Sequence, residues 1–238
     1  MAQVINTNVA SLFGQQALNK SNSALQTAMQ RLSSGLRINS AKDDITGMVT
    51  ASGYEKTFRG AAQAMRNAND GISTAQINDG YHQQIYDNLQ RLREIAVQLG
   101  GSASGAETTA LLAENARIRG LASATGAVVV ASNGATVTGV GAVVAAVTGT
   151  TIAAIDGDIT NVINARANYG ADMATFQSAI NNLGVQYTNV SAAYSRVMDT
   201  DYAVETTNMI RNQILQQAGT AMLAQANQVP NNVLTLLR

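Results

Sequence analysis

A heptad repeat of apolar residues between positions 155 and 197 constrains this chain more than any other feature. The apolar positions alternate in steps of four and three residues, and the one position that fails is Arg166. A period of 3.5 residues is typical of long α-helices that wind around partner helices in a left-handed supercoil. A helix over this stretch would be about 65 Å long, which is more than a compact domain needs. We call this set the 155–197 seam: Ile155, Ile159, Val162, Tyr169, Met173, Phe176, Ile180, Leu183, Tyr187, Val190, Tyr194 and Val197.

A second long helical region is expected from about Asp44 to Leu99. Apolar residues at helical spacing predict that this region buries one face along most of its length. The first stripe is Phe58, Ala62, Met65, Ala68, Ile72 and Ala75, and the second is Ile85, Leu89, Leu92, Ala96 and Leu99.

Local signals refine the expected ends and interruptions of these two helices. Ser40-Ala41-Lys42-Asp43 fits a capping box at a helix start, and Asn69-Asp70-Gly71 reads as a turn. Asp156-Gly157-Asp158 is interpreted as capping, because acidic residues favour the positive end of a helix. Gly170 and Gly184 each disfavour a helix by about 1 kcal/mol relative to alanine. We interpret these two glycines as places where a neighbouring helix approaches closely.

The two ends of the chain carry matching heptads, which predict two terminal helices that pair as a coiled coil. The alternative is the core of a simple helical bundle. Asn22 and Gly219 interrupt the stripes, so each helix alone would be marginal and would become ordered on assembly. The heptad positions, which we call the assembly seam, are Leu18, Leu25 and Leu32 near one end and Leu215, Met222, Val229 and Leu236 near the other.

The middle of the chain, about residues 120–151, differs from the rest because valine, glycine, threonine and alanine dominate it. Val128 to Val130, Ser132-Asn133-Gly134 and Ala135 to Val140 predict a β-hairpin with an Asn-Gly turn. The predicted fold class is therefore mainly α: a long-helix coiled-coil bundle with a small β-hairpin region in the middle of the chain.

The amino-acid composition argues against catalysis and metal binding. The chain has Cys 0 and His 1, so thiolate chemistry and paired imidazoles are impossible, and we expect no catalytic site, metal site or cofactor. His82 stands alone and is expected to be an exposed structural residue. The net charge of zero argues against a nucleic-acid partner. The uncharged segment from Gly120 to Ile155 contains too many glycine, serine and threonine residues for a membrane span, so no membrane partner is expected.

Both ends of the chain resemble bacterial flagellin. The matching segments are MAQVINTN at residues 1–8, RLSSGLRINSAKDD at 31–44, RNANDGIS at 66–73, LQRLREIAVQ at 89–98, SRVMDTDYAVETTNM from 195 and QILQQAGTAMLAQANQVPNNVLTLLR from 213. The likeness is colinear and reaches both termini. It covers about the first hundred and the last eighty residues. Only some 55 residues separate these two blocks, so the resemblance is to a short form that lacks the outer variable domains.

The resemblance implies a fold and a function. Residues 1–44 with 198–238 would form the inner-tube domain of paired terminal helices, and residues 45–197 would form a rod domain with the insert at about 120–151. RNANDGIS lies within a long helix in the family, which conflicts with a turn at Asp70-Gly71. The implied function is a non-enzymatic subunit that self-assembles into the extracellular flagellar filament for motility. One alternative is a hook–filament junction protein, and another is an enzyme built on the same scaffold. Residues 120–155 do not favour the enzyme, because they carry no acidic, basic, tyrosine or histidine side chain.

The resemblance also implies partners. Besides copies of itself, these are a flagellar export chaperone, the type III export apparatus, which needs no cleaved signal peptide, and the hook-junction and cap proteins. Host innate immune receptors are implied as well. A plant receptor kinase would read Arg37, Ile38, Asn39, Ser40, Lys42, Asp43 and Asp44, and the flagellin-sensing Toll-like receptor of animals would contact Arg91 as main anchor, with Glu94, Ile95 and Glu114.

Overall fold

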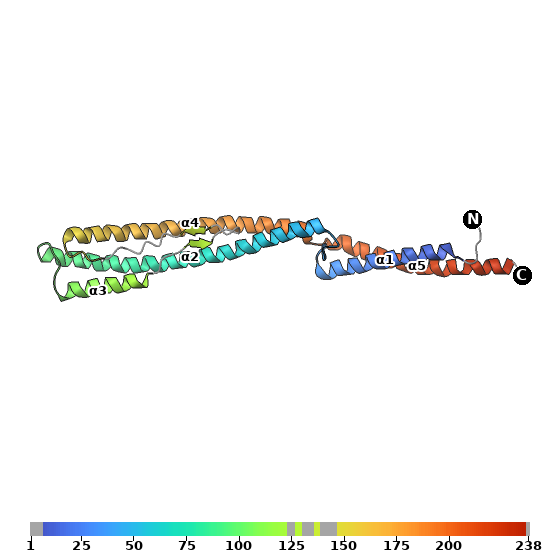
Figure 1. Cartoon of the computed structure of the whole chain (residues 1–238), viewed down its shortest axis with the longest axis horizontal. Helices are drawn as coiled ribbons and strands as arrows, with labels where there is room; N and C mark the ends of the chain where they lie inside the picture. The colour runs from blue at the N-terminus through green and yellow to red at the C-terminus, as the bar shows by residue number, and fades with distance from the viewer. Residues whose placement is uncertain (1–6, 123–126, 130–135, 139–146, 237–238) are drawn as a thin grey trace. The chain divides into compact units, whose positions relative to one another are not determined.

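The computed structural model describes residues 7–122, 127–129, 136–138 and 147–236, with residues 229–236 described by backbone alone. The described residues are mainly α-helical, as the sequence predicts (Figure 1). In chain order the elements are α1 (Val9–Ser34), α2 (Ile45–Gln98), α3 (Ala106–Leu121), β1 (Ala127–Val129), β2 (Thr136–Thr138), α4 (Ile152–Met198) and α5 (Tyr202–Leu236).

The chain divides into two compact units. The first unit joins Met1–Gly53 to Ala192–Arg238 and the second is Tyr54–Ser191, so both boundaries fall inside the long helices α2 and α4. The first unit contains the pair of terminal helices α1 and α5, and the second contains most of α2 and α4 together with α3. The assignment of these units to an inner tube and a rod stays a prediction.

The core of the second unit forms where α4 lies along α2 (Figure 1). From Ile155 to Leu183 the residues of the 155–197 seam are buried, except for the half-buried Met173 and Ile180, which confirms the heptad reading over that stretch. Beyond it the seam opens, and Tyr187 is 38% exposed. Alanines dominate the facing side of α2 in its first half, and larger side chains follow in its second half. The buried hydrophobic residues of that side are Ala61, Ala64, Ala68, Ala75, Ile85, Leu89, Leu92, Ile95 and Ala96.

Helix α2 continues through Asn69-Asp70-Gly71, so the predicted turn is wrong and the expectation from the resemblance is confirmed. Gly71 has a packing role instead, because a Cβ atom there would meet the ring of Phe176 at 3.1 Å. The close-approach reading of Gly170 and Gly184 is also wrong, since a Cβ at either position would meet nothing within 4 Å. Close approach in this unit therefore occurs at a glycine of α2 and not at the two glycines of the seam.

His82 is fully buried at 0% exposure, so the expectation of an exposed residue is wrong. It occupies the core side of α2, one turn before Ile85, and its ring packs edge-on against Tyr169 of α4 with the centroids 5.2 Å apart. Its Nδ1 lies 2.7 Å from the carbonyl oxygen of Asn78 and donates to it, because a carbonyl oxygen can only accept. Leu99 shows the opposite error: the sequence placed it in the buried apolar stripe, but it lies beyond the end of α2 and is 54% exposed.

The acidic residues before α2 act differently from the predicted capping box. Asp44, and not Ser40, caps the helix, because its Oδ1 accepts from the backbone N–H of Gly47 at 2.9 Å. Asp43 holds the preceding loop, with its Oδ2 accepting from the backbone N–H groups of Asn39 and Ser40 at 3.1 and 3.0 Å. These hydrogen bonds to the charged form lower the pKa of both carboxyls, led by Asn39 for Asp43 and by Gly47 for Asp44.

The acidic pair near the start of α4 lies inside the helix and not at its cap. Asp156 accepts from Nε of Arg93 at 2.6 Å, which ties α4 to α2. Asp158 accepts from the backbone N–H of Gly149 at 3.2 Å, which ties the helix to the loop before it. The capping interpretation of this pair is therefore wrong, and its carboxylates fix neighbouring segments.

Strands β1 and β2 pair antiparallel, with Val128 opposite Val137. The Asn133-Gly134 turn predicted between them lies outside the described residues, as does most of the 120–151 insert. The hairpin as a whole stays a prediction.

Candidate assembly interface and receptor segments

The terminal helices α1 and α5 lie side by side in the first unit (Figure 1). Two glycines let them approach. A Cβ on Gly14 would lie 3.0 Å from Cδ1 of Leu223, and a Cβ on Gly219 would lie 3.4 Å from Cδ1 of Leu18. A leucine of each helix thus packs against a glycine of the other helix, which is a close form of knobs-into-holes packing.

Asn8 fastens one end of this pair. Its side chain caps α1 by accepting from the backbone N–H of Ser11 at 3.1 Å, and its Nδ2 donates to the carbonyl oxygen of Ala226 in α5 at 2.8 Å. One side chain therefore satisfies a free N–H at the start of α1 and joins two segments that are 218 residues apart.

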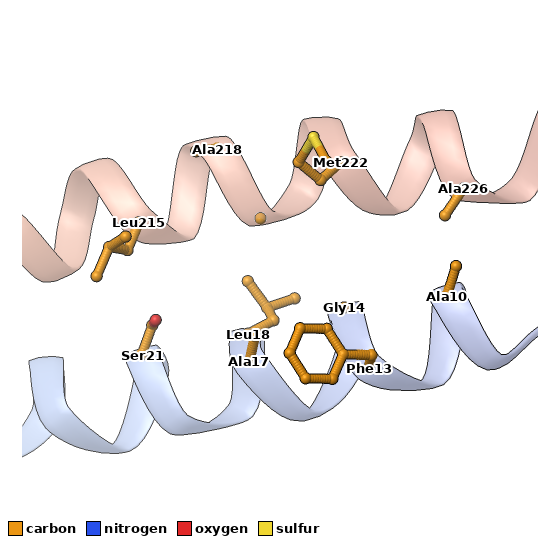
Figure 2. Close-up of a pocket in the computed structure, with 11 residues that line it drawn as sticks. Ala10, Phe13, Gly14, Ala17, Leu18, Ser21, Leu215, Ala218, Met222 and Ala226 are labelled. Carbon is orange, nitrogen blue, oxygen red and sulfur yellow. The ribbon is translucent and has the colours of Figure 1, made fainter.

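An open apolar groove of about 430 Å³ runs between α1 and α5. Figure 2 shows Leu18 pointing from α1 toward α5, with Phe13 on α1 and Met222 on α5 nearby. Phe13 is 73% exposed, Met222 68% and Leu215 49%. The groove is lined by Ala10, Phe13, Gly14, Ala17, Leu18, Ser21, Leu215, Ala218, Gly219, Met222 and Ala226.

The predicted assembly seam falls partly on this groove. Leu18, Leu25 and Leu32 are half-buried along α1, but Leu215 and Met222 are exposed groove residues and do not form the close contact with α1. The contact on α5 is made by Gly219 and Leu223, one residue along from Met222, so the predicted heptad follows the edge of the interface. The side chains of Val229 and Leu236 lie outside the described part of the chain.

The end of α1 is locked to the connection between α4 and α5. Gly35 ends the helix with a φ of 72°, a left-handed conformation that favours glycine. The backbone N–H of Thr200 donates to the carbonyl of Gly35 at 2.9 Å, and that of Arg37 donates to the carbonyl of Met198 at 2.6 Å. Arg31 and the buried Glu205 add an ion pair at 3.7 Å across the same junction. This junction was not predicted from the sequence, because backbone hydrogen bonds can form between residues of almost any type.

The plant-receptor segment forms the other half of that junction. Ile38 is 2% exposed, and Nη2 of Arg37 donates to the carbonyl of Val197 at 2.7 Å. Lys42 lies on the surface, while Asn39, Ser40 and Asp43 are held together by the hydrogen bonds described above. The structure thus keeps the predicted segment together and folds it into a turn before α2.

The predicted Toll-like receptor contacts lie on α2 and α3 of the second unit. Arg91 is half-exposed, and its guanidinium donates to Glu107 of α3 at 2.9 Å and to Glu94 at 3.1 Å. These two carboxylates raise the pKa of Arg91, with Glu107 the larger cause. Sequence reasoning missed Glu107, since only the fold brings α3 beside this stretch of α2.

The other two predicted contacts differ from Arg91. Ile95 is 7% exposed and packs in the core, so it does not offer a surface contact. The reason is the helical phase of α2, which places Ile95 three residues after the buried Leu92. Glu114 is on the surface of α3, where Nη2 of Arg117 donates to it at 2.6 Å and lowers its pKa.

Within the described ranges, acidic, histidine and cysteine side chains gather nowhere in a group able to hold a metal ion. Among the same residues, no helix combines the length and the apolar character that crossing a membrane would need.

The fold and the groove define a class: a long-helix protein whose two ends pair and present an apolar surface for association. Comparison with known proteins gives the family. A model of the bacterial flagellin N-terminal helical region matches residues 5–136, and a model of the bacterial flagellin C-terminal helical region matches residues 152–237. The chain belongs to the bacterial flagellin family, whose members are structural proteins of the flagellar filament.

Individual relatives support the same conclusion. The chain is 38% identical to a flagellin of Xenorhabdus nematophila and 32% identical to one of Bordetella bronchiseptica, with the whole of both chains covered in each case. These alignments run over 313 and 391 residues, more than the 238 of this chain, so the relatives carry segments that it lacks. A flagellin of Salmonella typhimurium is 50% identical over 141 residues, which are 56% of this chain and 28% of that protein. Nothing in these matches favours the hook–filament junction alternative.

Proposed function

We propose that the chain polymerises into the flagellar filament through the α1–α5 pair, with the groove as the surface that a second copy covers. The observation that carries this proposal is the exposure of Phe13 and Met222 on a groove lined almost wholly by apolar side chains. An exposed apolar surface of this kind marks an association site. The charged fraction of only 13% and the net charge of zero oppose association weakly.

The free energy of polymerisation comes from burying many small apolar contacts, at about 25 cal/mol per Å² of apolar surface. Between α1 and α5 themselves few large side chains are buried, and the close contacts are made at Gly14 and Gly219. The terminal helices of an isolated copy are therefore weakly held, and assembly adds the contacts that order them. Switching between slightly different lateral packings would give the filament its supercoil.

Further partners follow from membership of the family. An export chaperone binds the C-terminal segment, the type III apparatus exports the unfolded chain without a cleaved signal peptide, and hook-junction and cap proteins contact the ends of the extracellular filament. In this scheme residues 1–44 and 198–238 form the inner tube and residues 45–197 the rod. Co-purification of the export chaperone with the full chain, and its loss when residues 218–238 are deleted, would test the first step.

The decisive experiment is polymerisation of a Phe13→Glu variant. The side chain is 73% exposed, so the charge leaves the fold of the monomer intact but meets a second copy in the groove. We expect loss of seeded filaments in negative-stain images, with an unchanged circular dichroism spectrum. Leu121→Glu is the matched control, because Leu121 is 50% exposed at the end of α3 and outside the groove. Normal filaments from Phe13→Glu would contradict the assignment.

A second function, recognition by host receptors, is favoured by the exposed cluster of Arg91, Glu94 and Glu107. An arginine that holds two carboxylates on the surface presents a fixed, charged contact for a partner. The plant-receptor segment supports recognition of a different kind, because the folded protein engages Arg37 and buries Ile38. We propose that a plant receptor reads this segment after it has left the fold, and that a synthetic peptide of residues 30–51 is more active than the folded chain at equal concentration.

A further inference from the structure

Met222 carries the most exposed thioether among the described residues. Its side chain is 68% exposed, against 46% for Met29 and 42% for Met48. It lines the apolar groove between α1 and α5 (Figure 2). The chain has Cys 0, so no thiol competes with methionine for an oxidant. An oxidant that meets the free subunit would therefore find the most exposed methionine of the described residues on the surface assigned to polymerisation.

We propose that Met222 is an oxidation site through which peroxide blocks polymerisation. Hydrogen peroxide transfers one oxygen atom to the thioether: a sulfur lone pair forms the S–O bond, the O–O bond breaks, and water leaves. Sulfur loses two electrons and the peroxide gains them, so the step needs no other reactant. The inference rests on the proposed function of the groove.

The groove cannot satisfy the polar group that this step creates. Methionine sulfoxide carries a strong hydrogen-bond acceptor in place of an apolar thioether. Among the groove residues Ser21 has the one polar side chain, and it lies on α1 one turn beyond Leu18, opposite Leu215 and away from Met222 (Figure 2). The backbone N–H groups on either side belong to α1 and α5 and are used within the helices. Covering the sulfoxide with a second copy would bury an acceptor that few donors can reach, which is unfavourable.

The same geometry makes the oxidation state of Met222 depend on assembly. In the free subunit the sulfur is open to solvent, whereas a second copy on the groove would cover it. We therefore expect peroxide to oxidise Met222 quickly in the monomer and slowly in the filament. The exposed polar side chains of the second unit should not be oxidised in either state. Oxidised subunits would be excluded from growth, and a methionine sulfoxide reductase would return them to the assembling pool.

The test treats the purified full chain with hydrogen peroxide, locates the oxidised residues by peptide mass spectrometry and measures the critical concentration for seeded polymerisation. We expect the Met222 sulfoxide to raise the critical concentration at least tenfold, about 1.4 kcal/mol. Met222→Leu, which keeps an apolar side chain but removes the sulfur, should show the same critical concentration before and after peroxide treatment. Met29→Leu is the matched control and should stay sensitive, and Met222→Gln should reproduce the block without oxidant.

Two results would overturn the inference while leaving the proposed function intact. One is normal polymerisation of a chain whose Met222 is fully converted to sulfoxide. The other is a Met222→Leu variant that peroxide inhibits as strongly as the parent. Failure of the untreated parent to polymerise would instead overturn the proposed function, and this inference with it. A circular dichroism spectrum before and after treatment separates loss of assembly from loss of fold.

Discussion

The Cδ1 atom of Leu223 lies 3.0 Å from the point where a side chain on Gly14 would begin. This relationship sets how closely α1 and α5 approach, and of the two glycines at their contact Gly14 leaves less room for a larger residue than Gly219. Gly53 offers a comparison inside α2, since a Cβ atom there would meet nothing within 4 Å. The two glycines separate the effect of packing from the effect of helix propensity.

Gly14→Val should weaken the α1–α5 pair by about 1–3 kcal/mol, the usual result of overpacking a close contact. The added methyl groups overlap Leu223, and the stiff branched side chain cannot turn away easily. Amide hydrogen exchange of residues 10–35 measures the effect, because weaker pairing opens α1 more often. Gly53→Val is the control and should leave that exchange unchanged. Equal exchange in both variants would show that Gly14 is not a contact.

Phe176→Ala should destabilise the second unit by about 3–5 kcal/mol, since Phe176 is fully buried against Ala68 and Gly71. Chemical denaturation followed by circular dichroism measures the loss. Val185→Ala on the same helix is 62% exposed and should change the free energy of unfolding by less than about 0.5 kcal/mol. A Phe176→Ala variant as stable as the Val185→Ala control would show that the seam is not the core.

Alkaline pH should lower the free energy of unfolding of the second unit through Tyr169. Burial raises the pKa of its hydroxyl above the ordinary value of 10.0, with Asp172 adding to the shift. Above pH 10 the unfolded chain releases this proton while the folded protein keeps it, so the free energy of unfolding falls as the pH rises. Denaturation curves at increasing pH measure the slope. Tyr169→Phe removes the group and should flatten that slope, and an identical slope in the variant would contradict the prediction.

Arg91→Ala should lower activation of the flagellin-sensing Toll-like receptor by soluble monomer at least tenfold, about 1.4 kcal/mol on an equilibrium scale. The reason is loss of a charged, forked contact that Glu94 and Glu107 hold in place. A reporter-cell assay at matched folding measures activation. Arg59→Ala is the control, because Arg59 also lies on α2 and pairs with Glu55 on the surface. Equal activity of the two variants would remove the receptor role from this face.

The long helices could be predicted because their apolar periods extend over many turns. The buried stretch from Ile155 to Leu183 follows its heptad closely, and local turn signals such as Asn69-Asp70-Gly71 lost to the packing of the helix around them. His82 was misjudged because residue type suggested exposure, while its phase on α2, between Asn78 and Ile85, decided burial. Helical phase was the stronger guide at that position.

The candidate site was harder to predict than the fold. Leu215 and Met222 belong to a regular heptad, but the face that meets α1 is set by Gly219 and Leu223, where small and large residues interlock. The receptor segment of α2 shows the same limit, because it supplies both the buried Ile95 and the exposed Arg91. Only the position of α3 shows that Glu107 meets Arg91. Sequence motifs therefore identify such a region, but they do not show which of its residues are exposed.

The hydrogen bond from Asn8 to Ala226 has a consequence for the order of events in the cell. Its two ends are separated by 218 residues, so nearly the whole chain must leave the ribosome before α1 can meet its partner. Contacts this distant in sequence form late and slow folding. The groove between α1 and α5 is therefore among the later parts of the molecule to be completed, and a partly made chain has no finished groove for the proposed polymerisation.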